Sequence, residues 1–176
     1  MKIGFRKIMG ASLLFGLLCF QSVPAQRTNT TGKLNVWTTA RVSRDQNSSA
    51  SFREMRVAKQ KGFDRVVFEF AENVPNYNVH FEKPPITNYG GDDLKMSGKA
   101  FVVVQFHLVS YPEDADTSKI VLEIPRNKLS VPVVTEIKNS EWFEGYLSFA
   151  IGLKRRTPFR VQQLSNPARL VIDFKQ

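Results

Sequence analysis

The strongest constraint on this chain is a period-two alternation of apolar and polar side chains. It is clearest in FDRVVFEF at residues 63–70, where Val66 and Phe68 lie on one face and Arg65 and Glu69 on the other. Successive side chains of a β-strand point to opposite faces, so this alternation of β-branched, aromatic and charged residues predicts a strand buried on one side.

The same texture recurs, separated by turn residues, from Phe52 to the C-terminus. Strands are expected at 52–58, 63–70, 78–82, 94–109, 119–124, 133–139, 145–153, 159–164 and 169–174. In the longest of these, the side chains expected to face the core are Val102, Val104, Phe106 and Leu108. The pattern predicts an all-β fold, an antiparallel β-sandwich or flattened barrel of about eight or nine strands with little or no helix. A helix at 141–153 is disfavoured by Gly145 and Gly152.

The first 25 residues have the features of a secretory signal peptide. Lys2, Arg6 and Lys7 precede an uncharged apolar run at residues 8–20, and small residues at 23 and 25 suit cleavage after Ala25. The run is too short for a permanent membrane helix. We therefore predict a secreted protein of the periplasm or cell wall, with no transmembrane segment in the mature chain. The alternatives are a buried N-terminal helix and a lipid anchor on Cys19, which the bulky preceding leucine disfavours.

The net charge and the single cysteine narrow the class of protein and the partners to expect. The chain has 25 basic and 16 acidic residues, a net charge of +9; losing the three basic residues of the signal peptide leaves +6. Cys19 is the only cysteine, so the mature chain would have no disulfide, thiol nucleophile or cysteine-ligated zinc and would depend on its hydrophobic core. Outside the cytoplasm a basic surface favours wall polymers and lipid head groups. No dense basic block indicates nucleic-acid binding, and the charge also fits ordinary solubility.

The segment at 26–51 is rich in Thr, Ser, Asn and Arg and has no sustained periodicity. This composition predicts a flexible linker followed by one folded domain at 52–176. One short strand at NVWTT, residues 35–39, with Trp37 packed on the domain, is the alternative within it.

The chain offers little that resembles catalysis. His80 and His107 are the only histidines and occur in no metal-binding spacing, so no metal site and no cofactor are expected. The acidic loop at 111–118 fits a solvated surface better than a calcium site. No serine lies in a nucleophile elbow. Glu141 and Glu144 are the one carboxylate pair near aromatic residues, and a glycan hydrolase built on them is the enzymatic alternative.

Two groups of residues are candidates for ligand binding. The first is aromatic side chains in loop-like places, which either pack on sugar rings or close the end of the sandwich: Tyr77, Tyr89, Trp142 and Phe143. The second is arginines in and after a basic turn, which either pair with ligand carboxylates or remain solvated: Arg155, Arg156 and Arg160.

Two distant segments share one pattern, RVVFEF at 65–70 and RLVIDF at 169–174. If they pair antiparallel with Val67 opposite Val171, Arg65 lies opposite Asp173 and Glu69 opposite Arg169 on the outer face. Opposite charges across neighbouring strands contribute roughly 0.2–1 kcal/mol each. The pairing predicts a structural role for Arg169, whereas it supplies no partner for Arg160.

Four stretches resemble the AMIN and AMIN-like domains of bacterial envelope proteins. They are GFDRVVFEFAENVPNYNVHF, SGKAFVVV, FEGYLSFAIGL and PFRVQQLSNPARLVIDF, and the resemblance covers about residues 55–176. It implies a β-sandwich of two small sheets. AMIN domains occur in N-acetylmuramoyl-L-alanine amidases and secretin-type pilus proteins, where they bind peptidoglycan. This chain carries neither partner domain, which implies a stand-alone module. Its loop-rich middle, about 83–132, is closer to the AMIN-like variant.

The signal peptide, the basic charge, the lack of a catalytic set and the resemblance together predict a secreted, non-enzymatic module that binds peptidoglycan or another anionic wall polymer. The alternative is a protein–protein adaptor in an envelope assembly that uses a sheet edge or the aromatic loops.

Overall fold

The computed structural model describes residues 35–46, 48–110 and 119–176. The predicted signal peptide and the acidic loop at 111–118 lie outside these residues, as does the first part of the predicted linker.

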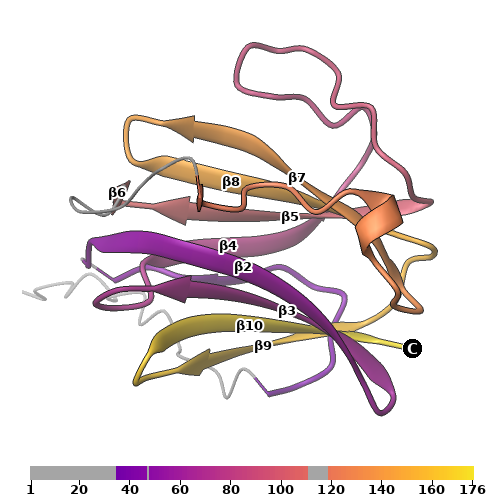
Figure 1. Cartoon of the computed structure of the whole chain (residues 1–176), viewed down its shortest axis with the longest axis horizontal. Coiled ribbons are helices and arrows are strands. Elements are labelled where there is room, and N and C mark those ends of the chain that lie inside the picture. The colour runs from indigo at the N-terminus through magenta and orange to yellow at the C-terminus, as the bar shows by residue number, and fades with distance from the viewer. Residues whose placement is uncertain (1–34, 47, 111–118) are drawn as a thin grey trace, which may run out of the picture.

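Ten strands in the described residues form two five-stranded sheets that pack face to face as a sandwich (Figure 1). Sheet I contains, in spatial order, β1 (Val42–Arg44), β4 (Asn76–Glu82), β5 (Ala100–His107), β8 (Tyr146–Leu153) and β7 (Val134–Phe143). Sheet II contains β6 (Val109–Ser110), β2 (Ala50–Gln60), β3 (Phe63–Phe70), β10 (Ala168–Lys175) and β9 (Phe159–Leu164). The pairing is antiparallel except between β2 and β6. The predicted all-β sandwich is confirmed.

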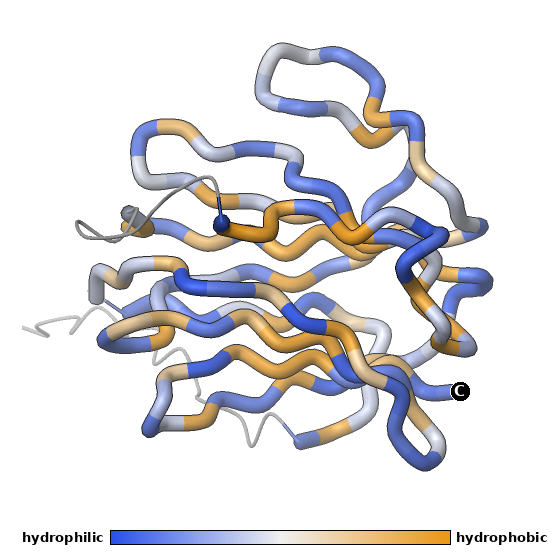
Figure 2. The backbone as a smooth tube through the Cα atoms, viewed as in Figure 1, coloured by the Kyte–Doolittle hydropathy of each residue, from blue (hydrophilic) through white to orange (hydrophobic). Residues whose placement is uncertain are grey.

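The core lies between the sheets and is dominated by phenylalanine. Phe68 of sheet II contacts Phe106 and Phe149 of sheet I, with ring centroids 5.2 and 5.1 Å apart, and all three side chains are buried. Edge-to-face and tilted contacts of this kind add about 0.5–1.5 kcal/mol to the burial itself. Hydrophobic residues alternate with polar ones along the strands, as the sequence predicts (Figure 2).

The structure departs from the expected elements at four places. The strand expected at 94–109 begins only at Ala100, so residues 94–99 belong to the preceding loop. The predicted linker contains β1 and the first two residues of β2, so its second half is part of the fold. Residues 119–124 form no strand, because their one backbone pairing is the isolated bridge between Ile124 and Ile137. Alternate side chains of this segment still pack against the core, and the short helix η2 (Arg126–Lys128) follows it. Leu108 has left-handed backbone (φ 63°) after the end of β5 and is exposed rather than inward-facing.

Strands β3 and β10 pair antiparallel in the register expected from their shared pattern. Val171 lies opposite Val67, and Asp173 lies opposite Arg65. Arg169 lies opposite Glu69. The two segments, about a hundred residues apart in the chain, are therefore the central pair of sheet II.

Candidate functional site

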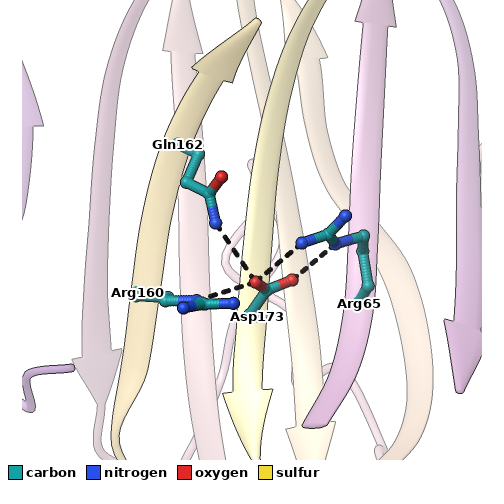
Figure 3. Close-up of polar contacts among 4 residues, drawn as sticks. All are labelled: Arg65, Arg160, Gln162 and Asp173. Atoms are coloured by element: carbon teal, nitrogen blue, oxygen red, sulfur yellow. Dashed lines mark hydrogen bonds and ion pairs between the residues drawn. The ribbon is translucent and has the colours of Figure 1, made fainter. Parts of the chain in front are cut away.

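Because the core fills both inner faces, ligands can meet only the outer faces, the edges and the ends of the sandwich. On the outer face of sheet II the dominant feature is Asp173, which is fully buried at the centre of a polar cluster (Figure 3). Arg65 donates from Nε to Oδ1 (2.7 Å) and from Nη2 to Oδ2 (3.0 Å). Arg160 Nε (2.8 Å) and Gln162 Nε2 (3.3 Å) donate to Oδ2.

This cluster gives Arg160 the partner that the sequence did not supply, which is Asp173. β9 pairs with β10 so that Arg160 lies opposite Asp173 on the side away from Arg65. Its guanidinium also lies 4.7 Å from the Trp37 ring centroid and 5.0 Å from that of Phe63. The hydrogen bonds to Asp173 raise the pKa of Arg65, a sign that the pair stabilises the charged forms. Arg160 is therefore a cross-strand partner first, and any ligand would compete with Asp173 for it.

Three further charged side chains on this face, and Arg169, also bond within the protein. Glu69 binds Arg56 at 3.0 Å rather than Arg169, and Arg56 also contacts Glu54. Arg169 donates to the backbone carbonyl of Pro167 instead. The outer face of sheet II is thus an ion-paired surface whose donors and acceptors largely satisfy one another.

The outer face of sheet I is different because a loop crosses it. Loop 83–99, between β4 and β5, packs a small apolar cluster on the sheet in which Ile86 contacts Phe101 and Ala150, flanked by Leu94 and Met96. The same loop is anchored to β7, because Ser97 donates to the Glu136 carboxylate through its backbone N–H (2.7 Å).

Where the loop ends, it leaves a groove of about 380 Å³ on the sheet. Residues 85–89 form the loop side of the groove. The sheet side includes polar side chains that the register aligns across neighbouring strands: Gln105, Ser148 and Glu141. Asn78 of β4 continues this alignment but lines the neighbouring hollow instead. We call these four residues the polar row. Ser148 is buried and donates to Glu141 at 3.3 Å. A second hollow of about 270 Å³ shares Gln105 and extends the surface toward β1.

An aromatic row lies directly beside the polar row. The register places His107, Tyr146 and Phe143 side by side on β5, β8 and β7. His107 and Tyr146 stack with centroids 4.3 Å apart, and Phe143 meets Tyr89 of the loop at 4.6 Å. Tyr89, Phe143 and Tyr146 are 64%, 44% and 45% exposed, which is unusual for rings of this size. The face therefore offers hydrogen-bonding groups and open ring surfaces together.

His80 closes one side of the groove. Its Nδ1 lies 3.2 Å from the Asn78 side-chain oxygen, and its Nε2 lies 3.2 Å from Glu82. Burial lowers the pKa of this imidazole, and the nearby Arg41 lowers it further, whereas Glu82 acts in the opposite direction. His80 is therefore neutral near pH 7 and presents a neutral ring to the groove.

Comparison with known families agrees with this architecture. The AMIN-like domain profile matches residues 50–176, well over half of the chain. The chain belongs to the AMIN-like domain family. No curated protein matches it.

The AMIN-like domain places the predicted aromatic residues in two different environments. Tyr89 and Phe143 are exposed beside the groove, as described above. Tyr77 is instead in β4, facing inward and 3% exposed, and burial raises the pKa of its hydroxyl. Trp142 is half-buried and packs edge-on against Phe52, 5.8 Å between centroids. The expectation that all four occupy loops is wrong because strands β4 and β7 are longer than their patterns indicated.

The basic turn lies far along the strand from the aromatic row. Arg155 and Arg156 follow the last residue of β8, whereas Tyr146 is the first. Both arginines are exposed, and the Arg156 guanidinium lies 3.8 Å from the Phe81 ring centroid. Glu144 is in the exposed turn between β7 and β8 (φ 47°) and does not line the groove, so it does not combine there with Glu141.

Other sites are weaker candidates. Among the described residues, no three His, Cys, Asp or Glu side chains gather as a metal site would require. A larger hollow, about 490 Å³, lies between the turns after β3 and β9, but no aromatic side chain lines it. No helix in the described part of the chain has the length and apolar character needed to cross a membrane.

The polar row was not found from the sequence. Considered strand by strand, outward polar residues such as Gln105 in β5 and Ser148 in β8 look like ordinary solvated positions. The sequence held one indirect clue. Val103 and Ala150 occupy outward positions but are apolar, which indicates that another segment covers the sheet there.

Proposed function

We propose that this AMIN-like domain is a non-enzymatic module of the cell envelope that binds a wall polymer, foremost peptidoglycan, through the groove on sheet I. Family membership supports an envelope module. The single observation that carries the finer proposal is the polar row lying beside the aromatic row on one open face.

Sugars match such a surface in both its parts. Their hydroxyl and amide groups exchange hydrogen bonds with amide, hydroxyl and carboxylate side chains such as those of Gln105, Ser148 and Glu141. Their C–H faces pack on aromatic rings such as the Tyr89–Phe143 pair. Neighbouring strands are about 4.8 Å apart, so a row across four strands extends roughly 14 Å, enough for a segment of a linear polymer.

The carboxylate pair predicted for hydrolysis, Glu141 with Glu144, does not assemble in the groove, which supports binding rather than hydrolysis. Glycoside hydrolysis uses two carboxyl groups on opposite sides of the scissile bond. Glu144 does not reach the groove, and Glu82, which does, is bonded to His80 and to the backbone of Lys83.

Co-sedimentation with intact peptidoglycan sacculi across a salt series tests the proposal. The purified exported protein should remain bound at about 0.3 M salt, where exposed charges are strongly screened. The double variant Tyr89→Ala/Phe143→Ala should lower the bound fraction about tenfold while the protein stays folded. Leu164→Ala is the control, because Leu164 is an exposed apolar residue on the other sheet.

Binding that vanishes with modest salt, or that is the same in the double variant and the control, would contradict this proposal. A protein-adaptor function is the second candidate, favoured by exposed Leu108 beside the aromatic row at the β7–β8 turn. It predicts that Leu108→Ser abolishes recovery of a defined envelope protein without changing sacculus binding.

A further inference from the structure

The charge of the groove is opposite to the charge of the chain. The chain has a net charge of +9, yet among the described residues no lysine or arginine lines the groove. Its acidic and imidazole lining groups are Glu82, Glu141 and His80. A groove evolved for a polyanion would carry arginine or lysine at this position.

Both carboxylates keep accepting capacity toward the groove. Glu141 receives one bond, from the Ser148 hydroxyl at 3.3 Å. Glu82 receives the backbone N–H of Lys83 at 2.9 Å on Oε1 and faces His80 with Oε2. A carboxylate has about four lone-pair sites, so each can accept further donors.

Two cations near the groove, Lys138 and Arg41, do not line it. Lys138 extends from β7 but donates its ammonium to the Lys95 carbonyl at 2.9 Å. Arg41 influences His80 from the β1 side, yet it does not line the groove. His80 is held neutral by burial. The two carboxylates therefore act as net negative charge toward a ligand at neutral pH.

We propose that the groove recognises a primary ammonium group carried by the wall polymer, set among hydroxyl or amide groups. This inference rests on the proposed function and names the chemistry that the same site selects. An ammonium donates three hydrogen bonds, and Glu141 with the polar row supplies charged and neutral acceptors for them. Such a group occurs either on an N-deacetylated amino sugar or on the free side-chain amine of a peptide stem.

Selectivity of this kind cannot come from the net charge of the protein. A basic chain repels a cationic ligand at long range, so the overall field acts against the predicted preference. Tighter binding of the ammonium form would therefore report the groove itself, and moderate salt should leave the preference in place.

Calorimetric titration of the full protein with matched ligand pairs at pH 7 tests the inference. One pair is a glucosamine oligomer and its N-acetylated counterpart; the other is a lysine-containing stem peptide and the same peptide acetylated on the lysine amine. In at least one pair the free amine should bind about tenfold tighter than its acetylated form, and the pair that shows this identifies the source of the ammonium.

Glu141→Gln and Glu82→Gln should each reduce this preference at least threefold while binding of the acetylated ligand stays within twofold. Glu123→Gln is the matched control, because Glu123 is exposed on the segment outside sheet I. Equal affinity for both members of each pair, or a preference that survives both glutamine variants, would overturn the inference.

Failure of the inference and failure of the proposed function give different results. If acetylated and free ligands bind equally and Tyr89→Ala/Phe143→Ala abolishes both, the groove binds wall polymer without ammonium selection. If neither ligand binds and sacculus binding is insensitive to groove variants, both proposals are wrong.

Discussion

The two outer faces of this sandwich are built by the same alternation but have opposite chemical character. On sheet II, Arg65, Arg160 and Gln162 surround the buried Asp173, so the polar groups satisfy one another. On sheet I the outward polar groups, such as Gln105, lie across a groove and remain open to a ligand. The comparison teaches that a densely charged surface can be structural, whereas the face whose polar groups keep open hydrogen-bonding capacity can be the binding face.

Loop 83–99 creates this difference. Its apolar cluster covers part of the outer face of sheet I. Residues 85–89 of the loop then form one side of the groove on the part of the sheet that stays open. In the described residues no comparable loop between strands covers sheet II: β2 and β3 are joined by the two-residue turn at 61–62, and Trp37 packs against Arg160 and Phe63. If the comparison is correct, variants on sheet II should change stability, and variants on sheet I should change binding.

The largest effect is expected for Asp173→Ala. It removes a buried carboxylate and leaves Arg65 and Arg160 facing each other without a counter-charge, which should lower the free energy of unfolding by about 3 kcal/mol. Chemical denaturation measures this loss, and Glu54→Ala on the exposed rim of the same face should cost less than about 1 kcal/mol. A similar loss of stability in the two variants would show that the buried Asp173 cluster is no more important for folding than the exposed ion pairs.

Gly152→Ala should break the docking of loop 83–99. A Cβ at this position would lie 2.1 Å from the backbone oxygen of Ser97 and 2.6 Å from the Thr135 hydroxyl, so the loop must move. We expect a loss of about 2 kcal/mol in stability, together with weaker sacculus binding. Gly90→Ala in the same loop meets only ordinary contacts and serves as the control. Unchanged binding in Gly152→Ala would show that the loop wall is dispensable.

Arg160→Gln sharpens the comparison at a residue that the sequence kept as a candidate ligand contact. It removes a charge-assisted hydrogen bond to Asp173, which keeps both bonds from Arg65, so the cost in stability should be about 1.5 kcal/mol. Sacculus binding of the folded variant should be unchanged. A tenfold loss of binding would instead move the ligand site to sheet II.

The smallest effect concerns pH and His80. Because the folded-state pKa of His80 lies below its ordinary value, the unfolded chain binds the proton more readily. The contribution of this neutral histidine to stability is complete above about pH 6.5 and falls as the pH drops through that value toward the folded pKa. His80→Asn should flatten this part of the stability–pH curve; an identical slope in both proteins would count against the burial of a neutral ring.

The sequence by itself determined the elements whose signal is local. Alternation at 63–70 and at 169–174 predicts strands without reference to the rest of the chain, and the shared Arg-to-acid pattern specifies which residues lie opposite one another. Register follows from such patterns because a slip of one residue would move every side chain to the wrong face.

Only the tertiary structure decided what the outward side chains meet. The partner of Arg160, the alignment of Asn78, Gln105, Ser148 and Glu141, and the wall formed by loop 83–99 all depend on which strands become neighbours. The period-two pattern states that a side chain faces outward but not what lies across from it. Strand order and loop packing supply that information, because they bring together residues that are far apart along the chain.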